Sequence, residues 1–250
     1  MKKIIAIIFC LFAFSLYAQV DTAGINKLDS KGRKQGVWKK YEKGKLLYEG
    51  QFKDNVPYGT FKYYFANGKL KSISDFQQGV HKVKSTLYHD NGKLASEGIF
   101  VDQLKDGVWK YYAKNGQLIT LEEYALGKRT GEWKTFSVED GNLLEESNYL
   151  NDKLNGIHKT YYTDGKPSLE ETYLDGARNG RCTSYLPKMV MSSTGDYLKG
   201  HRVGEWHYYD ANGKIRMTEE HKNDRVVKTY IYLSAESHLS EKILRPLPLP

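Results

Sequence analysis

The stretch Gly107-Val108-Trp109-Lys110-Tyr111-Tyr112-Ala113-Lys114-Asn115-Gly116 begins a unit of about 24 residues that recurs along most of this chain. The glycine that opens the unit returns at intervals of 23 to 25 residues, except across one altered unit. Internal repetition at this period indicates an array of small identical units rather than one globular core. The opening glycines are Gly36, Gly59, Gly107, Gly131, Gly156, Gly180 and Gly204.

Two further positions in each unit are occupied by large side chains. An aromatic residue follows the glycine by five positions in every unit, from Tyr41 to Tyr209. The altered unit has Val83 in place of the glycine but keeps the later positions in phase, so we count eight units and a shortened ninth at 226–232. A bulky residue follows the glycine by two positions at Trp38, Phe61, Trp109, Trp133 and Trp206, with His158 and Cys182 in the same slot.

The centre of each unit carries a reverse-turn signal. Asn-Gly and Asp-Gly tolerate positive φ and are the strongest short-range signal for a β-hairpin. The flanking residues are rich in Tyr, Trp, Phe, Thr and Val, which favour strands. The sequence therefore predicts an all-β fold: an elongated sheet of about eight consecutive antiparallel β-hairpins. The turn dipeptides begin at Asn67, Asn91, Asn115, Asp140, Asp164 and Asn212.

Counting outward from a two-residue loop at Asn115-Gly116 predicts the strand register. Lys110 should face Leu121, and Trp109 should face Glu122. The bulky slot and the recurring aromatic are three residues apart, so a regular strand would place them on opposite faces. Either both faces carry aromatic side chains, or a three-residue loop or a bulge shifts the register. The sequence leaves both alternatives open.

The two ends of the chain differ from the array in composition. Residues 1–18 have a basic start, an apolar run and a small residue at Ala18, which together predict a signal peptide and an exported protein. Residues 19–31 form a short lead-in, 32–232 the repeat array, and 233–250 a C-terminal cap and tail. Removal of residues 1–18 lowers the net charge from +8 to +6 and leaves Cys182 as the only cysteine. An intramolecular disulfide is then excluded, and an exported protein with this modest charge is not expected to bind nucleic acid.

No catalytic or metal-binding motif is found in the sequence. The seven histidines are scattered through unrelated repeat positions, and the glycines fall one per turn instead of forming a phosphate-binding loop. We therefore predict that the chain is not an enzyme and has no cofactor or metal.

Two features could carry binding. The aromatic residues could pack one hairpin on the next, or they could stack on a ligand if they are exposed on one face. A basic residue also precedes the opening glycine by two positions in several units, and these charges should line one edge of the sheet. They could attract an anionic partner, or they could keep the turns soluble and the edge unpaired. The candidate binding residues are Lys105, Arg129, Arg178 and Arg202.

The pattern Gly-x-Trp-x-x-Tyr, then Asn-Gly-x-Leu, then Tyr, present from Gly107 to Gly127 and again from Gly204 to His221, resembles the MORN-variant repeat family. The resemblance covers nearly all of residues 32–232. It implies consecutive antiparallel hairpins in an elongated sheet and no catalytic residues. Many bacterial members are labelled antitoxins of the YwqK type, and the resemblance implies that label here. A weaker similarity is to cell-wall choline-binding repeats, whose period is nearer twenty residues.

These observations predict an exported, non-enzymatic repeat scaffold that mediates protein–protein interaction in the periplasm, cell envelope or medium. An antitoxin or immunity role is one form of that function. The alternative is a cell-envelope module that binds an anionic polysaccharide, another carbohydrate or lipid headgroups. The exposure of the aromatic slots distinguishes these functions, because only exposed rings can stack on a ligand.

Overall fold

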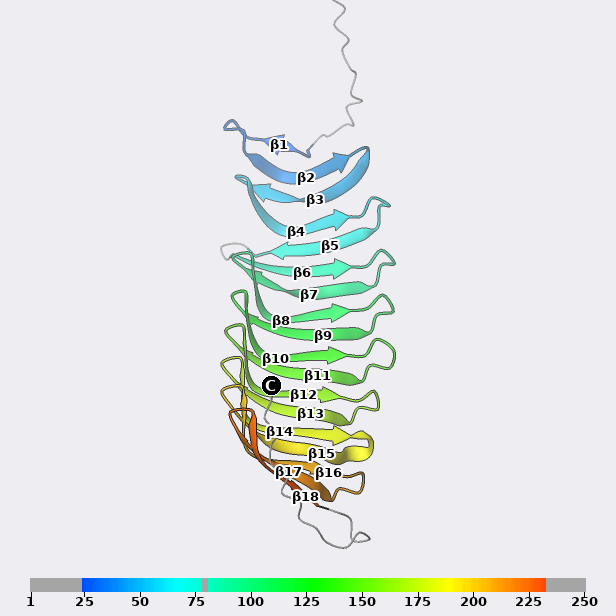
Figure 1. The fold of residues 1–250 in the computed structure, drawn as a ribbon. Coiled ribbons are helices and arrows are strands. Elements are labelled where there is room, and N and C mark those ends of the chain that lie inside the picture. Colours follow the sequence, from blue (N-terminus) through cyan, green and yellow to red (C-terminus); the bar gives the residue numbers. More distant parts are fainter. Residues whose placement is uncertain (1–23, 78–80, 233–250) are drawn as a thin grey trace, which may run out of the picture.

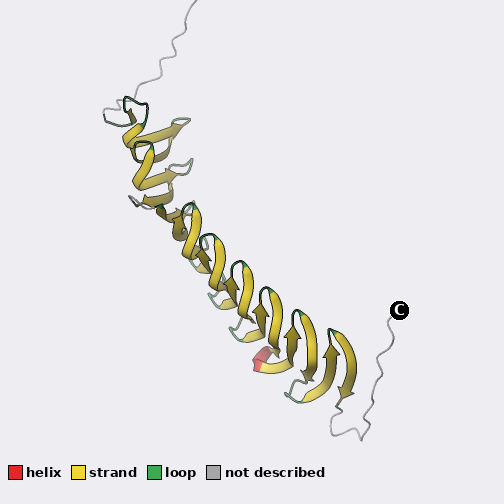
Figure 2. Cartoon of the chain, turned by 90° about the vertical axis from the view of Figure 1, so that its left-hand side faces the viewer, coloured by secondary structure: helices red, strands yellow, loops and turns green. Residues whose placement is uncertain are grey.

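The computed structural model describes residues 24–77 and 81–232, and in this part of the chain it shows one open antiparallel sheet of 18 strands (Figure 1). Each strand pairs with the strand before it and the strand after it in the sequence, from the β1–β2 pair to the β17–β18 pair. The sheet is long and narrow and follows a gentle arc (Figure 2). The predicted all-β hairpin array is confirmed.

Eight hairpins run from β2 to β17, with a short strand before them and one strand of a ninth unit after them. Within residues 24–77 and 81–232 one 3-10 turn, η1 (Pro187–Met189), interrupts the meander. The strands are β1 (Lys27–Leu28), β2 (Lys34–Glu42), β3 (Lys45–Lys53), β4 (Val56–Tyr64), β5 (Leu70–Phe76), β6 (Lys82–Tyr88), β7 (Leu94–Val101), β8 (Leu104–Tyr112), β9 (Leu118–Ala125), β10 (Lys128–Phe136), β11 (Leu143–Leu150), β12 (Lys153–Tyr161), β13 (Pro167–Leu174), β14 (Ala177–Leu186), β15 (Val190–Leu198), β16 (His201–Tyr209), β17 (Ile215–Lys222) and β18 (Arg225–Ile231).

The turn within each hairpin, which we call the first turn, has three residues in most hairpins, one more than the loop assumed in counting the register. The exceptions are β2–β3, joined by Lys43 and Gly44, and β10–β11, joined by residues 138–141. Ala113 N donates to Gln117 O, and Gly116 N donates to Ala113 O, so the loop has three residues. Gly116 has φ +94°, the left-handed conformation that closes this loop type. The two-residue loop assumed at Asn115-Gly116 is wrong, and the three-residue loop that the sequence left open is present.

The predicted register is nevertheless right in the strands. Lys110 faces Leu121, and Trp109 faces Glu122. Just beyond the loop Tyr112 pairs with Leu118 and Tyr111 with Thr120, so one residue of β9 is bulged. The bulge adds one residue to the return strand and thereby cancels the extra loop residue.

The second turn joins one hairpin to the next, and it is a two-residue turn with positive φ at both central residues. Asn151 and Asp152 have φ +49° and +69°, the pattern of a type I′ turn. Consecutive second turns are bonded to one another, because Asp152 N donates to Arg129 O in the preceding unit. We call the two long margins of the sheet the first-turn edge and the second-turn edge.

The opening glycine produces a wide bulge between one hairpin and the next. Gly107 has φ +68°, and residues 107–109 of β8 lie opposite the single residue Gly98 of β7. The altered unit has Val83 at this position, and β5 pairs with β6 without any register shift. A β-branched residue is strongly disfavoured at positive φ, so loss of the glycine removes the bulge.

Aromatic side chains occur on both faces of the sheet, and a three-residue loop and a bulge are present as well. The bulky slot lies on one face, which we call the ring face. Tyr64, five residues after its glycine, lies on the opposite face and donates a hydrogen bond of 2.6 Å to Glu49. That opposite face also carries cross-strand pairs such as Lys159–Glu170, with 3.3 Å between Nζ and Oε2, and we call it the Lys–Glu face.

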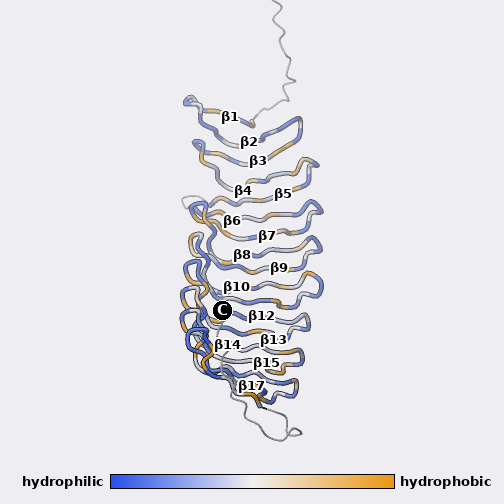
Figure 3. The backbone as a smooth tube through the Cα atoms, viewed as in Figure 1, coloured by the Kyte–Doolittle hydropathy of each residue, from blue (hydrophilic) through white to orange (hydrophobic). Residues whose placement is uncertain are grey.

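Hydropathy changes along every strand, and no compact apolar core gathers among the described residues (Figure 3). The first-turn edge is largely hydrophilic apart from exposed Val138 and Met189, and the second-turn edge includes more apolar stretches. Leu150, Leu174 and Leu198 are each at least half exposed there. The predicted signal peptide at 1–18 and the predicted cap and tail at 233–250 lie outside the described residues.

Candidate binding surfaces

A row of aromatic rings runs along the ring face and packs the hairpins together. The bulky slot supplies every second ring, and the residue opposite each opening glycine supplies the ring between. Phe61, for example, lies 5.1 Å from both Phe52 and Phe76, edge to face. Phe61, Trp109 and Trp206 are each only 2% exposed. Rings buried to this extent stabilise the array and leave no face for a ligand to stack on.

Three glycines make this close packing feasible. A Cβ placed on Gly98 would lie 2.2 Å from Cδ2 of Trp109, so the indole lies directly on the backbone of the preceding strand. Gly50 has the same relation to Phe61, and Gly195 to Trp206. Where the bulky slot holds a smaller side chain, the residue opposite it on the preceding strand is larger than glycine. Glu171, for example, lies beneath Cys182. The sequence carried this signal as a second periodic position, but we did not recognise it.

The four candidate basic residues recur near the second-turn edge, but their side chains lie across the ring face instead of projecting from the turns. Arg202 lies 4.2 Å from the ring centre of Trp206, and Arg129 lies 4.5 Å from that of Tyr149. Lys105 lies over Trp109 and Tyr124 at 5.0 and 4.7 Å. Cation–π contacts of this kind stabilise the ring row. The four cations are therefore engaged within the sheet.

Carboxylates under the ring row complete this network. Glu171 is 3% exposed, and its two oxygens bond to Arg178 Nε at 2.7 Å and Tyr173 Oη at 2.9 Å. Arg178 also lies 5.3 Å from the ring of Tyr197. Burial, and next the nearby Glu171, raises the pKa of the Cys182 thiol to about 11. A thiol with this pKa is protonated at neutral pH and is a poor nucleophile.

The histidines of the described residues do not gather into a metal-binding group. Among residues 24–77 and 81–232, no three His, Cys, Asp or Glu side chains come together as metal ligands. His158 bonds to Ser147, and His221 bonds to Glu219 at 3.0 Å. The part of the chain that the structure describes also has no helix long and apolar enough to cross a bilayer.

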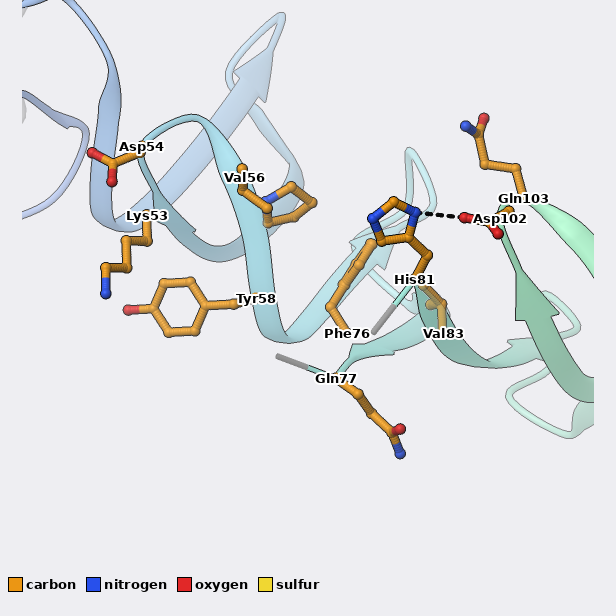
Figure 4. A pocket seen from close by; sticks show the side chains of 11 residues that line it. Lys53, Asp54, Val56, Tyr58, Phe76, Gln77, His81, Val83, Asp102 and Gln103 are labelled. Atoms are coloured by element: carbon orange, nitrogen blue, oxygen red, sulfur yellow. Dashed lines mark hydrogen bonds and ion pairs between the residues drawn. The ribbon is translucent and has the colours of Figure 1, made fainter. Parts of the chain in front are cut away.

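One cleft opens on the ring face at the second-turn edge, where the altered unit begins (Figure 4). Its volume is about 720 Å³. Val56, Pro57, Tyr58, Phe76 and Val83 form its apolar lining. Lys53, Asp54, Gln77, His81, Asp102 and Gln103 form the polar part. The sequence analysis identified Val83 as the altered position but did not predict a cleft.

The geometry of the hairpins agrees with a comparison of the sequence with known protein families. Five segments of the chain match the model of the MORN repeat variant. They are residues 57–78, 83–102, 105–125, 154–175 and 202–223. Each begins near a second turn and runs through a first turn to the following second turn, so the family unit coincides with the hairpin unit. The MORN-variant resemblance is confirmed for these five units.

Other comparisons add little. No curated protein matches the chain. Two solved structures of TarM align with part of it, one titled a crystal structure of TarM and the other a mutant of S. aureus TarM in complex with Fondaparinux, alpha-GlcNAc-glycerol and UDP. Both are 11% identical, with TM-scores of 0.28 and 0.29, and the matches cover 38% and 39% of this chain. The chain spans 19% of each TarM chain, and a similarity at this level supports no functional statement.

Proposed function

We propose that this chain is a non-enzymatic, exported scaffold that binds proteins through the edges and the interrupted region of a MORN-variant hairpin array. The observation that carries the proposal is the burial of the ring row. Phe61, Trp109 and Trp206 are buried in contacts between hairpins, and basic side chains such as Arg202 lie over these rings. The surfaces that remain available are the apolar second-turn edge, the Lys–Glu face and the cleft.

A flat or grooved surface of this kind suits a protein partner better than a small substrate. An extended sheet offers many shallow contacts along its length, as repeat arrays do when they bind other proteins. Apolar side chains at the second-turn edge such as Leu150, Leu174 and Leu198 could be covered by a partner. An antitoxin-like or immunity role of the YwqK type is one form of this function, in which the partner is a toxic protein.

The test is affinity capture from the cell envelope of the source organism with the full exported chain as bait. The scaffold proposal predicts recovery of a specific, saturable protein partner. Capture is run beside a glycan array and vesicles containing anionic lipid. Saturable binding to a purified glycan or to vesicles, with no protein recovered, would replace the scaffold by a carbohydrate- or headgroup-binding module. Localisation is read from fractionation, and a cytoplasmic chain with uncleaved residues 1–18 would contradict export.

A further inference from the structure

The cleft lies where four departures from the repeat pattern, at Pro57, His81, Val83 and Ser85, fall close together in space. Pro57 and His81 occupy the positions where neighbouring units place a cation over the rings, as Lys34 and Lys105 do. Ser85 takes the bulky slot in which other units hold a Trp or Phe ring. With no ring at Ser85 and no bulge at Val83, the ring row is interrupted after Phe76, and its apolar side is uncovered.

The two walls of the cleft come from neighbouring hairpins. Val56, Pro57 and Tyr58 lie on β4, and Val83 lies on β6 beside Phe76 of β5. Val56 is 63% exposed, which is the largest exposure among the apolar lining residues. His81 closes one end through a hydrogen bond of 2.5 Å to Asp102 (Figure 4). A cavity of this size and lining accommodates a large apolar side chain with part of its backbone.

The charge of the sheet changes sharply along its length, and the cleft lies in the basic part. Residues 24–101 hold 15 Lys and Arg against 7 Asp and Glu, a net charge of +8. Residues 102–232 hold 19 against 20, a net charge of −1. The net positive charge of the described residues therefore lies around β1 to β7. A field of this sign attracts acidic partners.

Several lysines around the cleft make no ion pair within the described residues. Lys53 lines the cleft and is exposed; Lys82 is also exposed, but it lies between His81 and Val83 and so faces the other side of the sheet. Lys34 lies on the ring face, over Trp38 and Phe52, and it too has no carboxylate partner in residues 24–77 and 81–232. The two carboxylates in the cleft are already engaged, Asp54 by Arg33 at 2.8 Å and Asp102 by His81. The unpaired charge near the cleft is positive.

We propose that this cleft binds an acidic segment of a partner protein, which inserts one apolar side chain between Pro57, Phe76 and Val83 on the ring face. Carboxylates flanking that side chain meet Lys53, which lines the cleft, and are attracted by the net positive charge of residues 24–101. The inference rests on the proposed scaffold function and specifies the partner by its chemistry. A polyanion without an apolar anchor would leave the apolar walls uncovered, so the combination of both features favours a polypeptide.

The experiment begins with a phage-displayed library of random dodecapeptides selected against the full exported chain. The expected result is enrichment of peptides with several Asp or Glu around one aromatic or aliphatic residue. The most enriched peptide is then synthesised with a fluorophore and its affinity measured by anisotropy at two salt concentrations. No enrichment, or enrichment of basic peptides, would overturn the proposal.

Matched variants locate the site. Val56→Asp and Lys53→Glu should each weaken binding of the selected peptide at least tenfold. Their controls are Leu174→Asp and Lys153→Glu, which change exposed residues of the same type at the same edge far from the cleft, and these should stay within twofold. Circular dichroism checks that all four variants fold. Equal binding of the peptide by Val56→Asp and by the parent would contradict the cleft assignment. Displacement of the labelled peptide by heparin as effectively as by the unlabelled peptide would contradict it too, because it would show a general polyanion-binding surface.

A final arm separates the cleft from the scaffold function. Affinity capture from envelope extract is repeated with Val56→Asp as bait. Loss of a partner that the parent recovers supports the cleft. Recovery of the same partner by both baits overturns the cleft while the scaffold function stands, and recovery of no partner by either contradicts both.

Discussion

Replacing Gly98 by alanine tests whether the ring row depends on bare backbone beneath each large ring. The new Cβ would lie 2.2 Å from Cδ2 and 2.3 Å from Cε2 of Trp109. Carbon atoms pack favourably at about 3.5–4.0 Å, so the indole must move by more than about 1 Å. That movement opens its contact with Phe100, now 4.7 Å between ring centres, and lengthens the 3.0 Å hydrogen bond from Nε1 to Ile99 O.

The expected cost follows from those two interactions. An aromatic pair contributes about 0.5–1.5 kcal/mol beyond its buried area, and a hydrogen bond contributes about 0.5–1.5 kcal/mol. Gly98→Ala should therefore lower the free energy of unfolding by about 1–3 kcal/mol, which is the usual range for overpacking. The assay is urea unfolding followed by tryptophan fluorescence and by circular dichroism.

Two controls make the result specific. Ser74→Ala changes the equivalent position in the unit where Ser85 replaces the ring, and it should cost less than about 0.5 kcal/mol because no ring lies there. In a Trp109→Ala background, which by itself should cost about 3–5 kcal/mol, Gly98→Ala should become nearly neutral. A Gly98→Ala protein as stable as the parent within about 0.3 kcal/mol, or additive effects in the double variant, would refute the reasoning.

Three further predictions concern the glycine bulge, the basic side chains and the buried thiol. Gly107→Val should lower the free energy of unfolding by about 1–3 kcal/mol because φ is +68° there, while Gly107→Asn should cost less; equal losses in urea titrations would contradict the role of the bulge. Arg202→Met should cost about 0.5–2 kcal/mol through loss of its contact with Trp206, and unchanged stability would indicate a cation free for binding instead. Cys182, whose pKa is raised to about 11, should react with a thiol reagent at pH 8 far more slowly in the folded chain than in urea. Because that pKa is raised in the folded state, its contribution to stability is complete below about pH 8.5 and is lost as the pH rises toward 11, and Cys182→Ser should remove this part of the pH dependence.

Much of the fold could be predicted from the sequence because each unit repeats its own turn chemistry. Asn115-Gly116 and the glycine at position 107 fixed the hairpins and the phase, and the predicted pairing of Lys110 with Leu121 is correct. The two-residue loop assumed in the counting was wrong, yet the register was right. A three-residue loop with a bulge gives the same strand pairing as a two-residue loop without one. Counting residues from the turn cannot separate these two solutions. Local bulges are decided by backbone conformations that residue type specifies only loosely.

The candidate site was harder to predict, because its features depend on contacts between units. Arg129 and Arg202 were recognised as periodic, but whether a cation extends outward or lies on a ring depends on the neighbouring strand. The cleft depends on Pro57, His81 and Ser85, which belong to two repeat positions in two neighbouring units and come together only in the folded sheet. Each is unremarkable by itself in the sequence.

The repeated residues and the altered ones thus play different parts in this protein. A ring over a glycine and a cation over a ring recur because every hairpin must bury one side against the next, and a side chain used for packing is not available to a partner. Where the third unit loses its glycine and its ring, at Val83 and Ser85, packing between hairpins is relaxed and an apolar surface is uncovered. An array would retain such a gap at a cost in stability only if something else covers it.

If the gap were merely a defect, restoring the ring with Ser85→Trp together with Ser74→Gly should stabilise the chain and leave partner capture intact. The docking role predicts instead that the same pair of changes fills the cleft and abolishes capture, so that stability and binding move in opposite directions.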